Sequence, residues 1–284
     1  MKFRAVFFLR AAAAALVSAA PVTQAAGHDD SIRPAKLETR PAKQETRSTK
    51  LEARPAKLET RPVKVDPNSL GKLDIEGSAP AFYYQPLGGR GLRPVVVFLH
   101  GRGGNPQRDC EKWGRVAREF GWVVCPSGPE DRGAGARGWA NNWTAAKAVV
   151  DKAMNALRDK FGRRVQLKGN TLIGFSEGAY VAMNVGVREP EVFNRWLILA
   201  ANDDYWGGEG AGELEKRYAH IKRVYLLTGE HDEVVGSTRR VFQLLDDAGV
   251  HVMMRIPEDL AHEIPEDRMR TLYRRPLRWL NSID

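Results

Sequence analysis

The sequence reads NTLIGFSEGAYVA at residues 170–182. The apolar run Thr171-Leu172-Ile173 predicts a buried strand, and the small residues after it predict a helix. Between the two lies a G-x-S-x-G pattern, Gly174-Phe175-Ser176-Glu177-Gly178. A sharp turn from strand to helix needs flanking positions that are nearly free of side chains. We therefore expect the Ser176 hydroxyl to stand at the edge of a sheet near a helix N-terminus, the alternative being a purely structural turn.

The same alternation of strand and helix extends in both directions from this segment. Further short apolar runs, typical of buried strands, lie at residues 95–99, 122–125, 196–200, 224–228 and 250–256. Helical patterns lie at residues 107–120, 144–161, 177–189, 237–248 and 265–282. Residues 70–85 are expected to add one or two edge strands. This alternation predicts an α/β fold in which a mostly parallel sheet has helices on both faces.

Parallel sheets of this kind gather chemistry at the carboxyl ends of their strands. A serine hydroxyl needs a base to act as a nucleophile. His262 follows the strand expected at residues 250–256, so it can reach that edge. The alternative base is His231, which neighbours an acid.

The base in turn needs a carboxylate that orients it. Asp232 lies just past the strand expected at residues 224–228. The alternatives are Asp203 and Asp204, which follow the strand expected at residues 196–200. The chain order Ser176, Asp232, His262 favours the first choice.

A tetrahedral intermediate also needs hydrogen-bond donors for its oxyanion. The strand expected at residues 95–99 ends in His100-Gly101-Arg102-Gly103-Gly104. Glycines let the backbone approach a substrate and point N–H groups at it. The backbone N–H of Glu177, just after Ser176, is the expected second donor, and His100 is expected to be a structural hydrogen-bonding residue.

These segments together resemble the α/β-hydrolase superfamily, across residues 95–263. Within it the sequence is similar to compact secreted esterases of the polyhydroxyalkanoate-depolymerase and feruloyl-esterase type, and to small carboxylesterases. The resemblance implies an α/β-hydrolase fold. The segment after residue 202, where this fold often inserts a lid, is short, so we expect only a minimal lid. The resemblance also implies Ser176 as nucleophile, His262 as base and Asp232 as its partner. The backbone N–H groups of Arg102 and Glu177 would then form the oxyanion hole.

Two loops are candidates for the substrate pocket. The first, at residues 126–142, has Trp139 and Trp143 at its far side, and the second, at residues 202–212, carries Tyr205 and Trp206. Aromatic rings there could stack on an acyl group, and the alternative is that they cap the core.

The N-terminal part of the chain has a different composition. Residues 1–26 are typical of a signal peptide, with an uncleaved anchor as the alternative. Residues 27–64 contain an arginine every seven residues, from Arg33 to Arg61, with proline in four of the units. Prolines and a single larger apolar position per unit exclude a coiled coil. The prediction is a disordered basic linker that either tethers the enzyme or contacts an anionic envelope surface weakly.

The formal net charge of +9 is concentrated in this part. Residues 1–26 carry +3, residues 27–32 carry −2, residues 33–64 carry +6, and residues 65–284 carry only +2. We therefore expect no nucleic-acid partner for the catalytic domain at residues 65–284. Export would allow a disulfide between Cys110 and Cys125, the alternative being two buried thiols.

The sequence therefore predicts an exported serine hydrolase, periplasmic or extracellular. It would cleave carboxylic esters of small molecules or polymers through an acyl-enzyme, with neither a cofactor nor a metal. The alternatives are a peptidase or thioesterase with the same three residues, and a non-catalytic envelope-binding protein that uses the repeat.

Overall fold

The computed structural model describes residues 66, 68–89, 91–203 and 206–282. Contacts divide the chain into two units, Met1–Thr60 and Arg61–Asp284, and the described residues lie in the second. The predicted signal peptide and the basic linker lie outside the described residues. Within the described ranges, no helix has both the length and the apolar character needed to cross a membrane.

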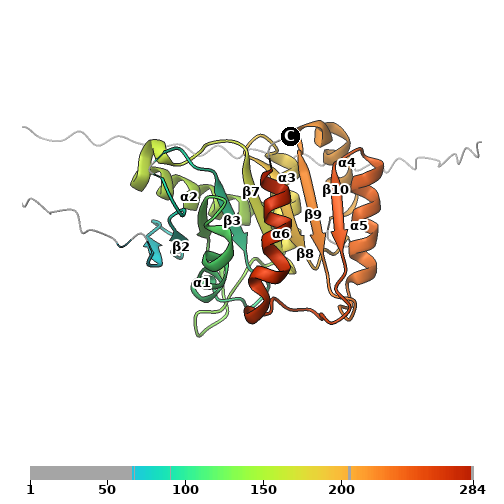
Figure 1. The fold of residues 1–284 in the computed structure, drawn as a ribbon, viewed down its shortest axis with the longest axis horizontal. Coiled ribbons are helices and arrows are strands. Elements are labelled where there is room, and N and C mark those ends of the chain that lie inside the picture. Colours follow the sequence, from blue (N-terminus) through green and yellow to red (C-terminus); the bar gives the residue numbers. More distant parts are fainter. Residues whose placement is uncertain (1–65, 67, 90, 204–205, 283–284) are drawn as a thin grey trace, which may run out of the picture. The chain divides into compact units, whose positions relative to one another are not determined.

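An eight-stranded sheet forms the centre of the described part (Figure 1). In spatial order its strands are β1 (Gly71–Leu73), β2 (Ala81–Tyr84), β4 (Trp122–Cys125), β3 (Val95–Leu99), β7 (Asn170–Phe175), β8 (Phe193–Leu199), β9 (Arg223–Leu227) and β10 (Val252–Arg255). The strands from β4 to β10 pair in parallel, while β1 and β2 are antiparallel additions at one edge. The predicted mostly parallel sheet is confirmed.

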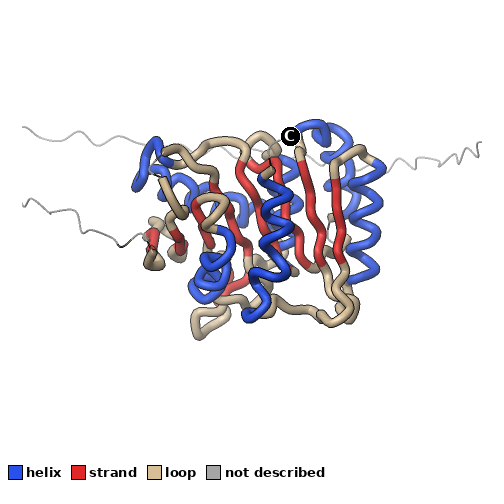
Figure 2. The backbone as a smooth tube through the Cα atoms, in the orientation of Figure 1, coloured by secondary structure: helices blue, strands red, loops and turns tan. Residues whose placement is uncertain are grey.

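Helices cover both faces of this sheet (Figure 2). One face carries α1 (Pro106–Ala117) and α6 (Met269–Asn281), and the other carries α2 (Trp143–Phe161), α3 (Glu177–Arg188), α4 (Gly207–Arg217) and α5 (Val235–Asp247). The central strand β3 is buried along its whole length, so both of its faces are apolar. Val96 and Phe98 pack with α1 and α6, whereas Val97 and Leu99 pack with α2 and α3.

Two elements of the structure differ from the sequence prediction. A short hairpin of β5 (Glu130–Asp131) and β6 (Arg137–Gly138) lies within the loop that follows β4. The segment expected to be a loop at residues 202–212 instead begins α4, although four of the helix's residues are glycine. Glycine costs about 1 kcal/mol per position in a helix. Burial of Trp206 and Leu214 offsets this cost, and a Cβ at Gly210 would come within 2.3 Å of the Trp206 ring.

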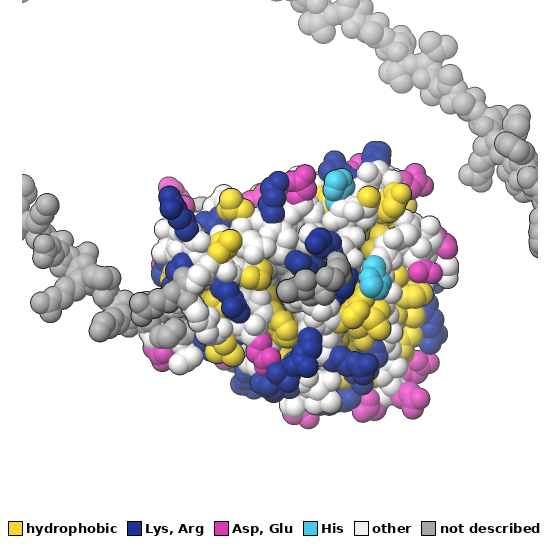
Figure 3. Space-filling model, turned by 45° about the horizontal axis from the view of Figure 1, so that its top comes forward, with side chains coloured by type: hydrophobic (Ala, Val, Ile, Leu, Met, Phe, Trp, Pro, Cys, Tyr) yellow, Lys and Arg dark blue, Asp and Glu magenta, His cyan; other side chains and the backbone are white. Residues whose placement is uncertain are grey.

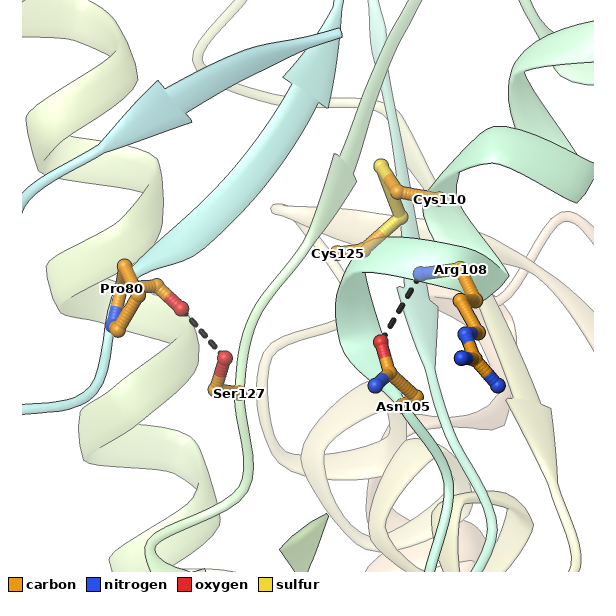
Figure 4. The surroundings of a disulfide bond; sticks show 6 residues. All are labelled: Pro80, Asn105, Arg108, Cys110, Cys125 and Ser127. Carbon is orange, nitrogen blue, oxygen red and sulfur yellow. Dashed lines mark hydrogen bonds between the residues drawn. A yellow bond between two sulfur atoms is a disulfide. The ribbon is translucent and has the colours of Figure 1, made fainter. Parts of the chain in front are cut away.

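A disulfide joins α1 to the end of β4 (Figure 4). Cys110 and Cys125 are fully buried, and their Cα atoms are 5.6 Å apart. Of the two alternatives left open by the sequence, the structure contains the bridge. Close by, the Asn105 side chain caps α1 by accepting a hydrogen bond from the Arg108 backbone N–H at 3.0 Å. The Ser127 hydroxyl donates to the carbonyl of Pro80 at 2.5 Å, which ties the loop after β4 to the segment before β2.

Charged side chains of both signs share the surface of the described part. On the face that Figure 3 shows, lysine and arginine stand in separate groups among acidic and uncharged side chains. Many of these charges are paired, as in the contact of Arg274 with Glu119 at 2.8 Å. This distribution agrees with the small formal charge of residues 65–284.

The order of the strands reverses between β3 and β7. After β3 the chain adds β4 on one side, and it later adds β7 on the other. Such a switch point leaves a crevice at the carboxyl ends of the two strands, where open α/β sheets bind ligands. His100 directly follows β3 and Ser176 directly follows β7, so both lie at this crevice.

Candidate active site

Ser176 occupies a strained turn between β7 and α3. Its φ of 54° and ψ of −118° place it in the left-handed half of conformational space, which residues with a side chain rarely adopt. The flanking glycines make this turn possible. A Cβ at Gly174 would lie 2.3 Å from the carbonyl oxygen of Gly178, and one at Gly178 would lie 2.1 Å from that of Leu99. Such strain is typical of functional sites, and here it holds one hydroxyl at the sheet edge.

Three side chains from three different loops form a chain of hydrogen bonds at this edge. Oγ of Ser176 lies 3.0 Å from Nε2 of His262. Nδ1 of the same imidazole lies 2.9 and 3.0 Å from the two carboxylate oxygens of Asp232. The carboxylate is almost fully buried, whereas the imidazole is 39% exposed. The bond to Asp232 places the proton on Nδ1, which leaves Nε2 as an acceptor facing the hydroxyl.

The loops that carry His262 and Asp232 are bonded to each other. The backbone N–H of His231 donates to the carbonyl of Leu260 at 3.1 Å. A Cβ at Gly229 would lie 1.9 Å from the same carbonyl oxygen, so only glycine permits this approach. Oδ1 of Asp232 also accepts the backbone N–H of Val234 at 3.0 Å. The carboxylate and the imidazole are therefore positioned by backbone contacts as well as by their own bond.

The structure places the alternative residues elsewhere. Asp203 forms a two-point contact with Arg240 at 2.5 and 2.7 Å, and this guanidinium holds the pKa of Asp203 below its usual value. Asp204 lies outside the described residues. His231 is exposed, and its side chain is not among those that line the cavity beside Ser176.

The loop after β3 lies against the serine turn. A Cβ at Gly101 would come within 2.9 Å of the Phe175 ring and 3.4 Å of the Ser176 Cβ. The N–H groups of Gly103 and Gly104 are used within the fold, since they donate to the carbonyls of Arg137 and Gly101. Glu177 is the first residue of α3, so its N–H has no partner within the helix. The N–H groups of Arg102 and Glu177 are thus placed on the two segments that flank Ser176.

His100 is a buried, neutral part of this loop. Its ring is 1% exposed, and burial lowers its pKa to about 4. Nδ1 donates to the carbonyl of Gly101 at 2.8 Å, and Nε2 accepts the N–H of Gly128 at 3.0 Å. The ring therefore joins the loop after β3 to the loop after β4, as expected of a structural hydrogen-bonding residue.

The carboxylate of Glu177 connects a third segment to the site. Its Oε2 accepts the backbone N–H of Trp139 at 3.0 Å, and its Oε1 accepts that of Asn141 at 3.1 Å. Oε1 also lies 3.3 Å from Nη2 of Arg102. The two residues after Trp139 adopt left-handed φ values, 52° at Ala140 and 49° at Asn141. Backbone of this conformation forms a concave anion site, and the buried carboxylate fills it.

The aromatic residues expected at the pocket are mostly packed into the fold. Trp139 is fully buried, stacks on His100 and donates from Nε1 to the His100 carbonyl at 2.8 Å. Trp143 begins α2, with the guanidinium of Arg188 3.9 Å above its ring. Trp206 is 4% exposed, and Tyr205 lies outside the described residues. None of the three described tryptophans lines the cavity beside Ser176, which agrees with the core-capping alternative.

A cavity of about 280 Å³ opens beside Ser176 and His262. Arg102 and Glu177 line it, as do six further residues: Asn141, Tyr180, Ala200, Asn202, Glu233 and Val234. Asn141 and Asn202 lie in the two loops predicted to form the pocket, although neither residue was singled out. Several of the six follow strand ends, so their positions in the sequence could have been used to predict that they lie near the site. Their orientation depends on loop paths that have no periodicity in the sequence.

The fold and this crevice have counterparts among solved structures. The chain is similar to esterase PE8, with 26% identity, a TM-score of 0.55, and coverage of 72% of this chain and 98% of that one. It is also similar to a ferulic acid esterase, with 16% identity, a TM-score of 0.58, and coverage of 75% and 98%. An S-formylglutathione hydrolase from Agrobacterium tumefaciens matches at 19% identity, a TM-score of 0.54, and coverage of 75% and 93%.

No protein-family model and no curated protein sequence matches the chain. The structural neighbours establish that the chain has the α/β-hydrolase fold. They are themselves esterases and hydrolases, which supports hydrolysis as the general class of reaction.

Proposed function

We propose that the chain is a serine-dependent carboxylic ester hydrolase in which Ser176, His262 and Asp232 act as a catalytic triad. The observation that carries this proposal is the continuous hydrogen-bonded path from Ser176 Oγ through the imidazole to the buried carboxylate. Ser176, at one end of this path, lines a cavity large enough for a small substrate. The same three functional groups in this geometry serve acyl transfer on unrelated folds.

Each group has a defined part in the proposed reaction. Nε2 of His262 takes the proton of the Ser176 hydroxyl while Oγ attacks the ester carbonyl, and Asp232 stabilises the imidazolium that forms. The negative charge that develops on the carbonyl oxygen is stabilised by the backbone N–H groups of Arg102 and Glu177. The imidazolium then gives its proton to the alcohol as it leaves. Water, deprotonated by His262, releases the acid from the acyl-enzyme.

The test combines active-site labelling with turnover. We expect a fluorophosphonate probe to label the wild-type protein, and short-chain p-nitrophenyl esters to be hydrolysed. Ser176→Ala should abolish both. Ser78→Ala is the matched control, because this serine contacts Lys152 and does not line the cavity. Retention of labelling and turnover in Ser176→Ala would show that another residue is the nucleophile.

A further inference from the structure

The cavity beside Ser176 is small and has a mixed polar and apolar lining. Only Ala200 and Val234 among its ten lining residues have purely aliphatic side chains. Its volume of about 280 Å³ lies at the lower limit for small-molecule sites. A long aliphatic acyl chain needs an extended apolar wall, which these residues do not supply. The cavity therefore suits a short acyl group that carries polar atoms.

One wall of the cavity contains a fixed positive charge. Arg102 and the backbone of Asn141 both contact the same oxygen, Oε1 of Glu177. The Glu177 side chain is only 3% exposed, whereas that of Arg102 is 50% exposed. The buried carboxylate therefore anchors the guanidinium from behind, while half of the arginine surface faces open space.

The charge of Glu177 is balanced mainly by groups other than Arg102. Two backbone N–H groups bind its oxygens at 3.0 and 3.1 Å, and it lies in the first turn of α3, where the helix dipole favours an anion. Arg102 adds one longer contact, through Nη2 alone at 3.3 Å. A guanidinium has five N–H donors in a planar fork that matches a carboxylate. Arg102 thus retains donors with which to bind an anionic group in the cavity.

The opposite charge at this cavity is less constrained. Glu233 also lines it, and the side chains of Glu233 and Arg102 are both exposed to solvent, but among the described residues no ion pair holds Glu233 in place. The guanidinium of Arg102 is held by a buried partner in the loop directly beside Ser176. The better-positioned charge is therefore the positive one.

We propose that the natural substrates are esters of short acids whose acyl group carries a second carboxylate, which Arg102 binds while Ser176 attacks the ester carbonyl. This inference rests on the proposed function and adds its substrate class. Hydrolysis of such a half-ester consumes one water, releases the alcohol, and leaves a dicarboxylate. Binding energy from the remote carboxylate orients the carbonyl for attack.

The test compares esters that differ in one group. Monomethyl succinate carries the carboxylate, methyl succinamate replaces it with a neutral amide, and methyl butyrate has a methyl group in its place. Turnover is followed by titration of the released acid at constant pH. We expect kcat/KM for monomethyl succinate to exceed that for methyl succinamate by about tenfold or more, as for a charge-assisted contact. Arg102→Gln should bring this ratio close to one.

Two variants and one further substrate complete the design. Arg239→Gln removes a positive charge that is paired with Glu230 outside the cavity, and it should leave the ratio unchanged. Glu233→Gln should raise the ratio, because it removes a repulsive carboxylate. A preference for methyl 4-aminobutyrate that Glu233→Gln abolishes would overturn the inference in favour of cationic substrates.

The remaining outcomes separate the two proposals. A wild-type ratio of one or below, or a ratio that Arg102→Gln leaves intact, overturns the substrate class and leaves the serine hydrolase standing. Labelling by fluorophosphonate without turnover of monomethyl succinate does the same. Absence of both labelling and turnover of every ester rejects the proposed function itself, and the substrate class with it.

Discussion

The carboxylate of Glu177 accepts the backbone N–H of Trp139 at 3.0 Å, although 38 positions separate the two residues. This bond attaches the loop that forms one side of the cavity to Glu177, the residue that follows Ser176. The geometry of the cavity thus depends on a side chain that is adjacent to the proposed nucleophile but takes no part in bond making.

Substitution of Glu177 by glutamine should loosen this loop. The amide keeps one acceptor oxygen but turns an NH₂ group toward a backbone N–H, so one of two buried hydrogen bonds is lost. Loss of a bond to a charged group costs about 1.5–3 kcal/mol, or roughly 10- to 100-fold in kcat/KM if it acts in full on the transition state. We expect faster hydrogen exchange at residues 139–142, a lower succinate-to-succinamate ratio, and retained fluorophosphonate labelling. Glu189→Gln, at the other end of α3, is the control. Unchanged exchange and kinetics in Glu177→Gln would exclude this positioning role.

Substitution of Asp232 by asparagine should reduce kcat by about 10³- to 10⁴-fold, because an amide can stabilise the wrong imidazole tautomer and cannot stabilise the imidazolium. Asp203→Asn removes a carboxylate that is bound to Arg240, so it should leave kcat near the wild-type value. Steady-state kinetics on one soluble ester measure both. If the two variants exchanged these phenotypes, Asp203 would be the partner of the base.

Acid should destabilise the fold through His100. Its folded pKa of about 4 lies below the ordinary value of 6.5, so the unfolded chain takes up a proton first as the pH falls. This contribution, about 3 kcal/mol, is complete above pH 6.5 and is lost as the pH falls toward 4. Protonation of Nε2 would also break the bond from Gly128.

The measurement of this effect requires a comparison of variants. Burial raises the pKa of Asp109 to about 6. This group therefore makes the fold less stable as the pH rises from 4 to 6, which is opposite to the effect of His100. Urea unfolding of wild type and His100→Asn across pH 4–7 cancels that shared term. The free-energy difference between the two proteins should shrink toward low pH. A difference that stays constant with pH would mean that His100 does not titrate in this range.

Removal of the disulfide should lower stability without removing activity. The bridge closes a loop of 15 residues, which corresponds to about 3 kcal/mol in the chain-entropy account. Cys110 lies in α1 and Cys125 ends β4, and neither lines the cavity. The double variant Cys110→Ala/Cys125→Ala should therefore unfold at lower urea concentration and keep its kcat. Equal stability of oxidised and variant protein would argue against a bridge in solution.

The basic repeat should be dispensable for chemistry. Deletion of residues 33–64 removes a formal charge of +6 but none of the residues that line the cavity. We expect kcat/KM on a soluble ester to change by less than about twofold, as predicted for a linker that takes no part in the reaction. Sedimentation with anionic vesicles separates the two interpretations of the repeat. Weaker binding after deletion supports envelope contact, and equal binding supports a tether.

Residues that follow strand ends were the most predictable part of the site. Ser176, Asp232 and His262 each follow an apolar run, and parallel strands bring their carboxyl ends to one edge, so local patterns predicted that all three lie there. The same patterns placed Asp203 and Asp204 at this edge, and the chain order was needed to favour Asp232. The contacts that form the wall of the cavity were harder to predict from the sequence. Glu177 was recognised for its backbone N–H, but the partners of its carboxylate are main-chain groups of a distant loop, which no side-chain pattern reports.

The aromatic residues and α4 were harder to anticipate for a related reason. Trp139 carries no sequence signal that separates stacking on a substrate from stacking on His100, because only the loop path decides which face it meets. The glycine content of α4 argues locally for a loop, and the helix forms because Trp206 and Leu214 gain burial in the assembled core.

The loop that ends in Asn141 is anchored through its main chain, since Glu177 binds N–H groups that every residue except proline possesses. Side chains at positions 140 and 141 can therefore change without loss of the anchor, provided that they tolerate a left-handed backbone, as glycine, asparagine and aspartate do. The side chains of this loop can thus be substituted without changing its attachment to Glu177. Exchange of the side chain at position 141 would therefore change the wall of the cavity while the hydrogen-bonded arrangement of Ser176, His262 and Asp232 stays in place.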